Sequence, residues 1–366
     1  MTRMTIPWWQ PKVEKGDYRF IQRALDRNFV NEGPQAREFE ERIAKLVGAR
    51  YAVSATSCTA AIFLALKAAG VKAGDEVLVP DMTFIATAHA VDLLGAKVVL
   101  VDVDPQTLNI DPSKIARAIT KRTRAIIPVH VTGRAADMNA ITQIAKKHRL
   151  AVIEDAAEAF MSKYGKRFLG TIGDAGCFSF SPNKTISTGQ GGVIVTSSKK
   201  IYEALKPLKD QGRPQRGTGG DDVHFSVGYN FKLTDLQAGA GLGQLKHLSK
   251  RLKRMKRNYA LYAKHLKGIG DIRVFPSRKG EVPQWTDIET RKRDELEKYL
   301  RSKGIDSRKY WHPIHRQRAY RQSDNKFPAS TRLSYRALWL PSAFTLSDAD
   351  IHTVCRAIKD FFKNAR

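Results

Sequence analysis

The sequence has few cysteines and no long apolar stretch. Its three cysteines, Cys58, Cys177 and Cys355, lie far apart and are odd in number, so neither a disulfide framework nor a metal-binding cysteine pattern can be built from them. No stretch approaches the ~20 consecutive apolar residues that a membrane-spanning helix needs, and the first residues lack the apolar core of a signal peptide. We therefore expect a protein of the reducing cytoplasm, with no membrane partner and no bound metal.

Acidic residues are also in short supply. The 366 residues include 63 Lys and Arg against 36 Asp and Glu, which gives a net charge of +27. Such an excess is typical of nucleic-acid-binding proteins, and it would also suit an anionic small substrate such as a nucleotide diphosphate. The basic residues are spread along the chain, however, and in the densest run, 246–267, Leu248, Leu252 and Met255 recur at helical spacing. That run predicts an amphipathic helix with a solvated basic face, so we expect no specific nucleic-acid partner.

Short apolar runs alternate with helical patterns between about residues 50 and 200. Six runs are predicted to be strands of one sheet: 76–80, 97–101, 124–129, 150–154, 176–180 and 192–196. The first four are almost continuously apolar, as buried parallel strands are. Helical patterns at 112–119 and 137–148 lie between them. This alternation predicts an α/β fold in which helices cover a largely parallel sheet.

The pattern changes after about residue 250. A long basic helix leads into a segment that Pro and Trp punctuate, and a further helix is predicted at 293–304. We therefore predict a large domain over residues 13–250 and a smaller C-terminal domain over residues 251–366. The N-terminal segment 1–12 is predicted to pack on the smaller domain.

Two polar segments lie where an α/β sheet binds ligands. Ser57-Cys58-Thr59 precedes the apolar helix predicted at 60–69, and the free N–H groups of a helix N-terminus attract an anion such as phosphate. Taken alone, the segment is more simply an ordinary Ser or Thr cap. Asp155 follows the apolar run 151–154, where a carboxylate is placed either to pair with a protonated pyridine nitrogen or merely to cap a helix.

A lysine follows one of the predicted strands. Lys184 lies between the run 176–180 and a glycine-rich turn at 189–192. Partial burial there would lower the pKa of its amine and make it nucleophilic, although a surface lysine is a strong alternative in so basic a chain. A fourth segment, 228–237, opens a helix rich in small residues, which indicates close packing in a core or a dimer.

Taken in order, these segments resemble the nucleotide-sugar aminotransferases of the DegT/DnrJ/StrS type, a branch of the fold-type I pyridoxal-phosphate enzymes. The likeness covers nearly the whole chain. The motifs that carry it are modest one by one and specific in this order: 31–34, 39–40, 74–77, 83–87, 102–104, 128–130, 153–158, 178–192, 210–213, 228–230, 311–315, 340–341 and 350–351. The resemblance implies a three-layer α/β/α, aspartate-aminotransferase-like domain with a smaller C-terminal α+β domain.

The resemblance also implies a role for each matching residue. Lys184 is expected to hold pyridoxal 5′-phosphate as a Schiff base and to move the protons of the reaction, and Asp155 to pair with the ring nitrogen. Pyridoxamine 5′-phosphate would be the second form of the cofactor. The other residues expected at the cofactor are Ser57, Thr59 and Ser179 at the phosphate with Cys58 between them, Phe84 on the ring face, Glu158 near the phenolic oxygen, and Asn230 reaching the phosphate of a partner subunit. Asn31, Arg213 and His315 are expected at the substrate.

Three positions depart from the family pattern. Cys58 stands where glycine is usual, and it would be strained there if the turn needs a positive φ. Gln190 replaces a common glutamate, and Lys232 replaces a common arginine. A related branch carries histidine in place of the lysine and dehydrates sugars, so the presence of Lys184 favours amino transfer.

We therefore expect a cytoplasmic homodimer that moves an amino group from L-glutamate to a nucleotide-linked keto sugar by a ping-pong mechanism. A 4-keto-6-deoxyhexose is the expected kind of sugar, and the product would enter surface polysaccharide or a glycosylated metabolite. Two alternatives stay open. One is a pyridoxal-phosphate-dependent sugar dehydratase or an altered relative, and the other is a basic nucleic-acid-binding regulator whose affinity would not depend on the cofactor.

Overall fold

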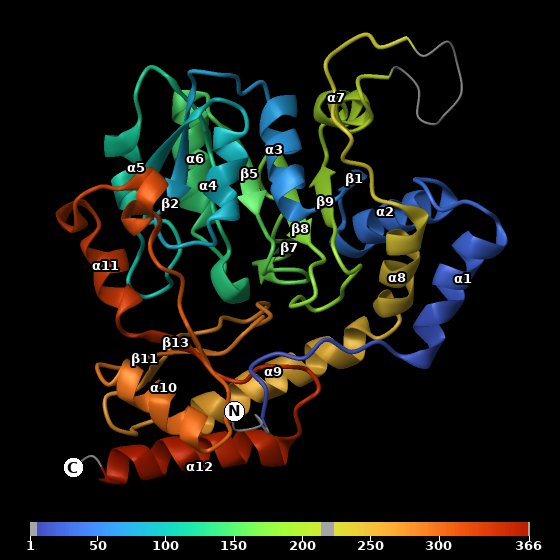
Figure 1. Ribbon diagram of the computed structural model, residues 1–366. Helices are drawn as coiled ribbons and strands as arrows, with labels where there is room; N and C mark the ends of the chain where they lie inside the picture. The colour runs from blue at the N-terminus through green and yellow to red at the C-terminus, as the bar shows by residue number, and fades with distance from the viewer. Residues whose placement is uncertain (1–5, 214–222, 365–366) are drawn as a thin grey trace.

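A seven-stranded sheet forms the centre of the computed structural model, which describes residues 6–213 and 223–364 (Figure 1). Its order is β1-β9-β8-β5-β4-β2-β3. The strands are β1 (Tyr51–Ala55), β2 (Glu76–Pro80), β3 (Lys97–Val101), β4 (Thr123–Ile126), β5 (Ala151–Asp155), β8 (Ala175–Ser179) and β9 (Gly192–Thr196). β9 runs antiparallel to both neighbours, and the other pairings are parallel. The α/β fold and the parallel pairing of the four apolar runs are confirmed.

Two of the strands differ from the prediction. β4 ends at Ile126, three residues before the predicted end at residue 129, because Val129 makes only an isolated bridge to Asp155. β1 is not predicted by the apolar pattern, since Ser54 and small alanines interrupt its apolar run. It is nevertheless buried, and it pairs with β9 along its full length.

Helices cover both faces of this sheet, as in a three-layer α/β/α fold (Figure 1). One face is covered by α3 (Cys58–Ala68), α4 (Ala86–Asp92) and α7 (Lys199–Lys209). The other face is covered by α2 (Pro34–Val47), α5 (Pro112–Ala118), α6 (Met138–His148) and α8 (Asp235–Leu245), and α1 (Tyr18–Asp26) packs against α8. Successive side chains of β2 point to opposite faces of the sheet: Val77 and Val79 pack against α3 and α4, whereas Leu78 packs against α5 and α6.

The C-terminal third contains a second, antiparallel sheet in the order β10-β11-β13-β12. Its strands are β10 (Arg273–Val274), β11 (Asp287–Glu289), β12 (Arg308–Lys309) and β13 (Ala337–Trp339). The helices of this part are α9 (Leu248–His265), α10 (Arg293–Ser302), α11 (Pro328–Ser334) and α12 (Asp348–Asn364). A small hairpin of β6 (Lys163–Tyr164) and β7 (Arg167–Phe168) lies apart, and short 3-10 turns occur at Lys15–Asp17, Val131–Gly133, Ile314–Arg316, Arg318–Tyr320 and Asp324–Lys326.

The predicted basic helix is α9, which lies along the base of the molecule beside α12 (Figure 1). Leu248 and Met255 are buried, as the helical spacing predicts. Arg251 is buried too. Its guanidinium donates to the backbone carbonyl oxygens of Thr185 and Lys12 at 3.0 Å each, which satisfies the buried charge. The basic face of α9 is therefore not wholly solvated. Among the described residues, no helix is both long and apolar enough to cross a bilayer.

The two sheets are joined by a buried ion pair. The guanidinium of Arg134, which follows β4, donates to both carboxylate oxygens of Asp287 on β11 at 2.7 and 2.6 Å. The described part of the N-terminal segment also contacts the C-terminal part of the chain, since Ile6 exchanges backbone hydrogen bonds with Gly304 and Asp306, between α10 and β12, at 3.2 and 2.9 Å. Residues 1–5 lie outside the described residues, and the domain boundary at residue 250 stays a prediction.

Candidate active site

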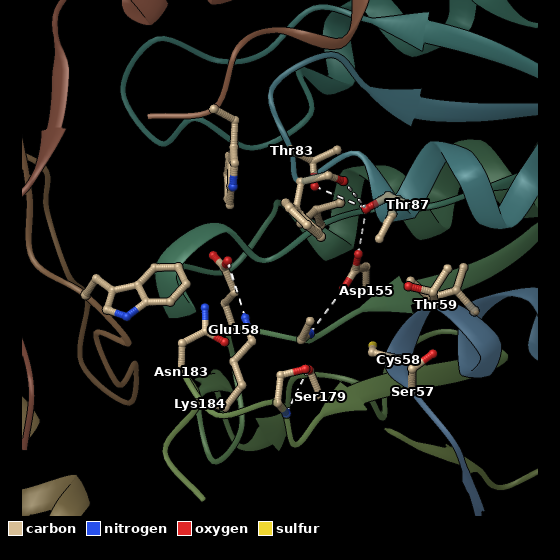
Figure 2. A pocket seen from close by; sticks show the side chains of 18 of the residues that line it. Ser57, Cys58, Thr59, Thr83, Thr87, Asp155, Glu158, Ser179, Asn183 and Lys184 are labelled. Atoms are coloured by element: carbon tan, nitrogen blue, oxygen red, sulfur yellow. Dashed lines mark hydrogen bonds and ion pairs between the residues drawn. The ribbon is translucent and has the colours of Figure 1, made fainter. Parts of the chain in front are cut away.

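A cavity of about 320 Å³ opens where β5 and β8 end beside the N-terminus of α3 (Figure 2). The predicted residues that line it are Ser57, Cys58, Thr59, Phe84, Asp155, Glu158, Ser179 and Lys184. The other lining residues are Ile62, Thr83, Ala86, Thr87, Val129, Ala157, Ser181, Asn183, Gln190, Trp285, Arg308, Trp311 and Trp339. Strand ends and a helix N-terminus thus meet at one place, as expected for an α/β ligand site.

The N-terminus of α3 supplies an anion site to this cavity. Ser57 is the N-cap, and its Oγ accepts a hydrogen bond from the backbone N–H of Ala60 at 3.1 Å. Helix geometry leaves the N–H groups of Cys58 and Thr59 without intrahelical acceptors, so they are free for a phosphate. Gly192 makes the site possible, because a Cβ there would lie 2.4 Å from the carbonyl oxygen of Ser57 and 2.7 Å from the nitrogen of Cys58.

Cys58 occupies this turn without backbone strain. It is the first residue of α3 and is not among the described non-glycine residues with positive φ. The strain considered in the sequence analysis therefore does not arise. Burial raises the pKa of the Cys58 thiol, and the nearby Asp155 carboxylate raises it further. The thiol is thus protonated at neutral pH and is unsuited to act as a nucleophile.

Asp155, the last residue of β5, is a buried carboxylate. Its Oδ2 accepts a hydrogen bond from Thr87 Oγ1 at 2.8 Å, and its Oδ1 accepts one from the backbone N–H of Ala157 at 3.1 Å. Burial nevertheless raises the pKa of Asp155, although the hydrogen bond from Thr87 opposes the rise. A buried carboxylate of this kind is stabilised by a cation. A protonated pyridine nitrogen fits this position.

Glu154, the neighbour of Asp155 on β5, anchors the end of the strand from the opposite face. Its carboxylate accepts hydrogen bonds from the backbone N–H groups of Gly170 at 2.8 Å and Gly173 at 2.7 Å, and it lies 2.9 Å from Nε2 of His130. His130 Nδ1 accepts a hydrogen bond from the N–H of Ala136 at 3.2 Å, so the ring proton sits on Nε2 and is donated to Glu154. We did not predict this pair, and the sequence feature that indicates it is a glutamate inside an apolar run.

Lys184 brings its amine to the middle of the cavity, as Figure 2 shows. Its Nζ lies 3.6 Å from Glu158 Oε1 and 4.9 Å from the ring centroid of Trp285. Glu158 Oε2 accepts a hydrogen bond from the N–H of Thr132 at 2.8 Å, which fixes the carboxylate. Burial raises the pKa of Glu158, and the charge of Lys184 opposes the rise. Glu158 is therefore positioned to hold the ammonium form of Lys184.

These groups fit pyridoxal phosphate. The α3 N-terminus suits its phosphate, Asp155 suits its ring nitrogen, and the Lys184 amine suits its aldehyde carbon. Ser179 ends β8 in the same cavity, where its Oγ donates to Ser181 Oγ at 3.2 Å, and Phe84 lines the cavity with 53% of its surface exposed. When bound, the cofactor would supply an electron-poor ring that stabilises negative charge on a substrate carbon.

Four of the predicted residues do not line this cavity, and three of them lie near one another. Asn31 lines a separate hollow of about 180 Å³ with Asp210 and Lys232, and those two side chains form an ion pair. Arg213 lies 3.7 Å from the Asp210 carboxylate, and Asn230 forms a β-bridge with Asp210. The structure thus gathers Asn31, Arg213 and Asn230 around Asp210 at the surface. Their predicted contacts with cofactor and substrate stay predictions.

His315 also lies apart from the cavity. Its side chain is fully buried, with Nδ1 2.6 Å from Asp81 Oδ2 and Nε2 3.0 Å from Asp324 Oδ1. Its ring stacks on Phe327 with centroids 4.7 Å apart. Both ring nitrogens are therefore engaged, and they link the end of β2 to the segment before α11. The predicted contact of His315 with the substrate stays a prediction.

The aromatic side of the cavity is not foreseen by the sequence analysis. Trp285, Trp311 and Trp339 line it, and they belong to the second sheet and its loops. The other two tryptophans of the chain, Trp8 and Trp9, pack on Trp285 with ring centroids 5.1 and 6.5 Å away. The segment that Pro and Trp punctuate is the signal for this wall. We define the tryptophan wall as Trp8, Trp9, Trp285, Trp311 and Trp339.

Comparison with known proteins agrees with this geometry. The model of the DegT/DnrJ/EryC1/StrS aminotransferase family matches residues 11–359. GDP-perosamine synthase from Escherichia coli O157:H7 is 34% identical over 98% of this chain and 99% of that protein. The crystal structure of S. venezuelae DesV superposes with a TM-score of 0.90 at 31% identity, covering 95% of this chain and 94% of DesV.

The PLP form of the putative sugar aminotransferase Spr1654 from Streptococcus pneumoniae shares the fold. Its TM-score is 0.93 at 24% identity, with 99% of both chains covered. The cavity, with a lysine amine, a buried carboxylate and a phosphate-binding helix end, is the one that pyridoxal phosphate requires. The chain therefore belongs to the DegT/DnrJ/EryC1/StrS aminotransferase family, and it is a pyridoxal-phosphate-dependent sugar aminotransferase.

Proposed function

We propose that the enzyme transfers an amino group from L-glutamate to a nucleotide-linked keto sugar in a ping-pong reaction. The observation that carries this proposal is the convergence of Lys184, Asp155 and the α3 N-terminus on one cavity. At about 320 Å³ the cavity is at the small end of ligand sites, so amino donor and keto sugar would occupy it in turn. Sequential use of one site is the structural basis of a ping-pong order.

Lys184 would serve both halves of the reaction. In each half its amine would take a proton from one carbon and return it to another, as a positioned general base and acid. Glu158, 3.6 Å from the Lys184 amine, would stabilise the ammonium form between these two transfers. Asp155 would keep the ring nitrogen protonated, and hydrogen bonds from Thr87 and Ala157 hold that carboxylate in place.

We further propose that the enzyme acts as a cytoplasmic homodimer, with Asn230 reaching the cofactor phosphate of the partner subunit. Asn230 is exposed and lies outside the cavity of its own chain. Phe225 and Val227, shortly before it, each expose 76% of their surface, which suits a surface covered by a second copy. Sedimentation equilibrium tests the dimer. Asn230→Ala should weaken cofactor binding about 10-fold without loss of dimerisation.

The visible absorption spectrum tests the proposed reaction. Addition of L-glutamate to the holoenzyme should bleach the cofactor band and release one 2-oxoglutarate per subunit, because no acceptor is present for a second turnover. A keto sugar nucleotide should then restore the band and appear as an aminated sugar by mass spectrometry. An unchanged spectrum contradicts glutamate as donor. A product that has lost a hydroxyl group and gained no nitrogen identifies a dehydratase instead.

A further inference from the structure

One arginine lines the cavity together with Lys184. Arg308 lies on β12, lines the cavity and is exposed. Its guanidinium carbon lies 5.1 Å from the ring centroid of Trp8 and 5.8 Å from that of Trp339. Stacking on indole faces orients a guanidinium but leaves its charge and its N–H donors unneutralised.

The neighbouring lysine shows what Arg308 lacks. Lys309 Nζ lies 2.7 Å from Asp294 Oδ1, an ion pair on the other side of the strand. Within the described ranges no carboxylate forms such a pair with Arg308. The two adjacent basic residues of β12 thus differ. Lys309 is paired with a carboxylate at the surface, whereas Arg308 lines the cavity and has no carboxylate partner among the described residues.

The rings beneath Arg308 are those of Trp8 and Trp339. Trp339 lines the cavity, and its indole N–H is buried, so the ring contributes an aromatic face to the guanidinium and no accessible donor. A guanidinium that has no carboxylate partner among the described residues and lines a ligand cavity is suited to bind an oxyanion.

The position of Arg308 suits a substrate group that lies well away from the reacting carbon. Lys184 Nζ lies 4.9 Å from the Trp285 centroid, Trp285 lies 5.1 Å from Trp339, and Arg308 follows Trp339 at 5.8 Å. The guanidinium is therefore separated from the catalytic amine by two indole rings. An anion at Arg308 would belong to the far end of a substrate whose near end lies at Lys184.

We propose that Arg308, held on the tryptophan wall, binds an oxyanion at the far end of the substrate and thereby sets its register in the cavity. This inference rests on the proposed function, because it identifies the group by which the substrate is recognised. Two sources supply that chemistry: the diphosphate of the sugar nucleotide and the distal carboxylate of the amino donor. Arg308 is a positioning residue here, since it contacts neither the cofactor nor the reacting carbon.

The test compares Arg308→Ala, Arg308→Lys and the matched control Lys309→Ala as holoenzymes. Calorimetric titration measures the Kd of UDP, GDP and dTDP as diphosphate probes and of glutarate as a carboxylate probe that cannot react. Unchanged cofactor absorbance and thermal unfolding verify that each variant is folded. We expect Arg308→Ala to weaken one kind of probe about 10- to 100-fold, Arg308→Lys to retain part of that affinity, and Lys309→Ala to stay within about 2-fold of wild type.

A loss confined to the diphosphates identifies the sugar nucleotide as the source, and a loss confined to glutarate identifies the amino donor. The inference is overturned if Arg308→Ala binds both kinds of probe as wild type does, or if wild type binds neither. Bleaching of the visible cofactor band by L-glutamate is measured in a separate experiment, because it tests the amino donor and not Arg308. A wild type that binds diphosphate through Arg308 but ignores glutamate would contradict the proposed donor and leave this inference standing.

Discussion

The two sides of the active-site cavity are built on different principles. The side that belongs to the large sheet is polar: Asp155 and Glu158 both have hydrogen-bond donors supplied by the chain. The side that belongs to the second sheet is aromatic, and its indole N–H groups at Trp8, Trp285 and Trp339 find no acceptor among the described residues. One side thus holds its polar groups in place by hydrogen bonds within the chain, and the other presents aromatic faces to the cavity.

This difference separates two tasks. Asp155 ends β5, and Lys184 lies in the turn that follows β8, so the large sheet positions both groups, as suits groups that must stay in place through every turnover. The tryptophan wall offers broad aromatic faces, which suit a group that enters and leaves. We infer that the polar side determines the chemistry and that the aromatic side determines the substrate. The following predictions test that division.

The largest effect is expected from Lys184→Ala. The variant loses both the cofactor attachment and the general base, so we expect turnover to fall at least ~1,000-fold and the visible cofactor band to change. The control Lys200→Ala removes an exposed lysine on α7 and should leave turnover unchanged. Stopped-flow absorbance measures both. Retention of glutamate bleaching by Lys184→Ala would refute the assignment of the polar side to chemistry.

Asp155→Asn should lower turnover at least ~100-fold, because an amide cannot neutralise a protonated ring nitrogen. The same substitution should stabilise the cofactor-free protein at neutral pH, although it lowers turnover. Burial raises the pKa of Asp155, so the folded state favours the protonated carboxyl, and the free energy of unfolding falls as pH rises from the unfolded pKa of ~3.9 through the raised value.

The cofactor-free Asp155→Asn variant lacks that loss, so its advantage over wild type should grow between pH 4 and neutral pH. Thermal unfolding across that pH range measures the difference. Asp360→Asn, an exposed change on α12, is the control and should show no such trend. Identical pH dependence of Asp155→Asn and wild type would mean that the carboxylate bears no burial cost.

Arg134→Ala breaks the contact between the two sides. It leaves Asp287 buried without its cation, which should lower the free energy of unfolding by about 3–5 kcal/mol. The exposed pair of Arg257 and Asp348 is the matched control, and Arg257→Ala should cost much less because solvent screens that pair. Urea denaturation measures both. Equal costs would show that the two sides are held together mainly by their apolar contacts.

Cys58→Gly should have the smallest effect. Glycine in the first turn of α3 adds conformational freedom to the unfolded chain and removes a buried side chain, so we expect a loss of about 1–2 kcal/mol by urea denaturation. Cys58→Ala separates these two causes. The cofactor dissociation constant should stay within about 2-fold, because the proposed phosphate site uses the backbone N–H of residue 58 and not its side chain. A large change would show that the Cys58 side chain itself contributes to the polar side.

The residues of the polar side could be predicted because their motifs occur in the order of a known family, although each local signal alone had a simpler explanation. Asp155 follows an apolar run, Lys184 lies four residues after another, and Ser57 precedes an apolar helix. Strand order then brings them together without further information, since the ends of neighbouring strands meet at one edge.

The aromatic side could not be predicted in the same way. Its strands β11 and β13 are three residues long and β12 is two, too short for any periodic pattern. Its pairings also span the chain, as Trp8 meets Trp285 and Trp339. The burial of His315 could not be predicted for a related reason: its partner Asp81 is 234 positions away, so nothing beside the histidine in the sequence indicates that contact.

The tryptophan wall has an optical consequence. The chain contains five tryptophans, and all of them belong to the wall beside the cavity. Tryptophan emission, excited selectively over that of tyrosine, therefore comes from rings that line the cavity or pack on its wall, and cofactor or substrate entering the cavity would quench it or shift its wavelength. The enzyme carries its own fluorescent reporter, so occupancy of the cavity can be followed in real time without a label.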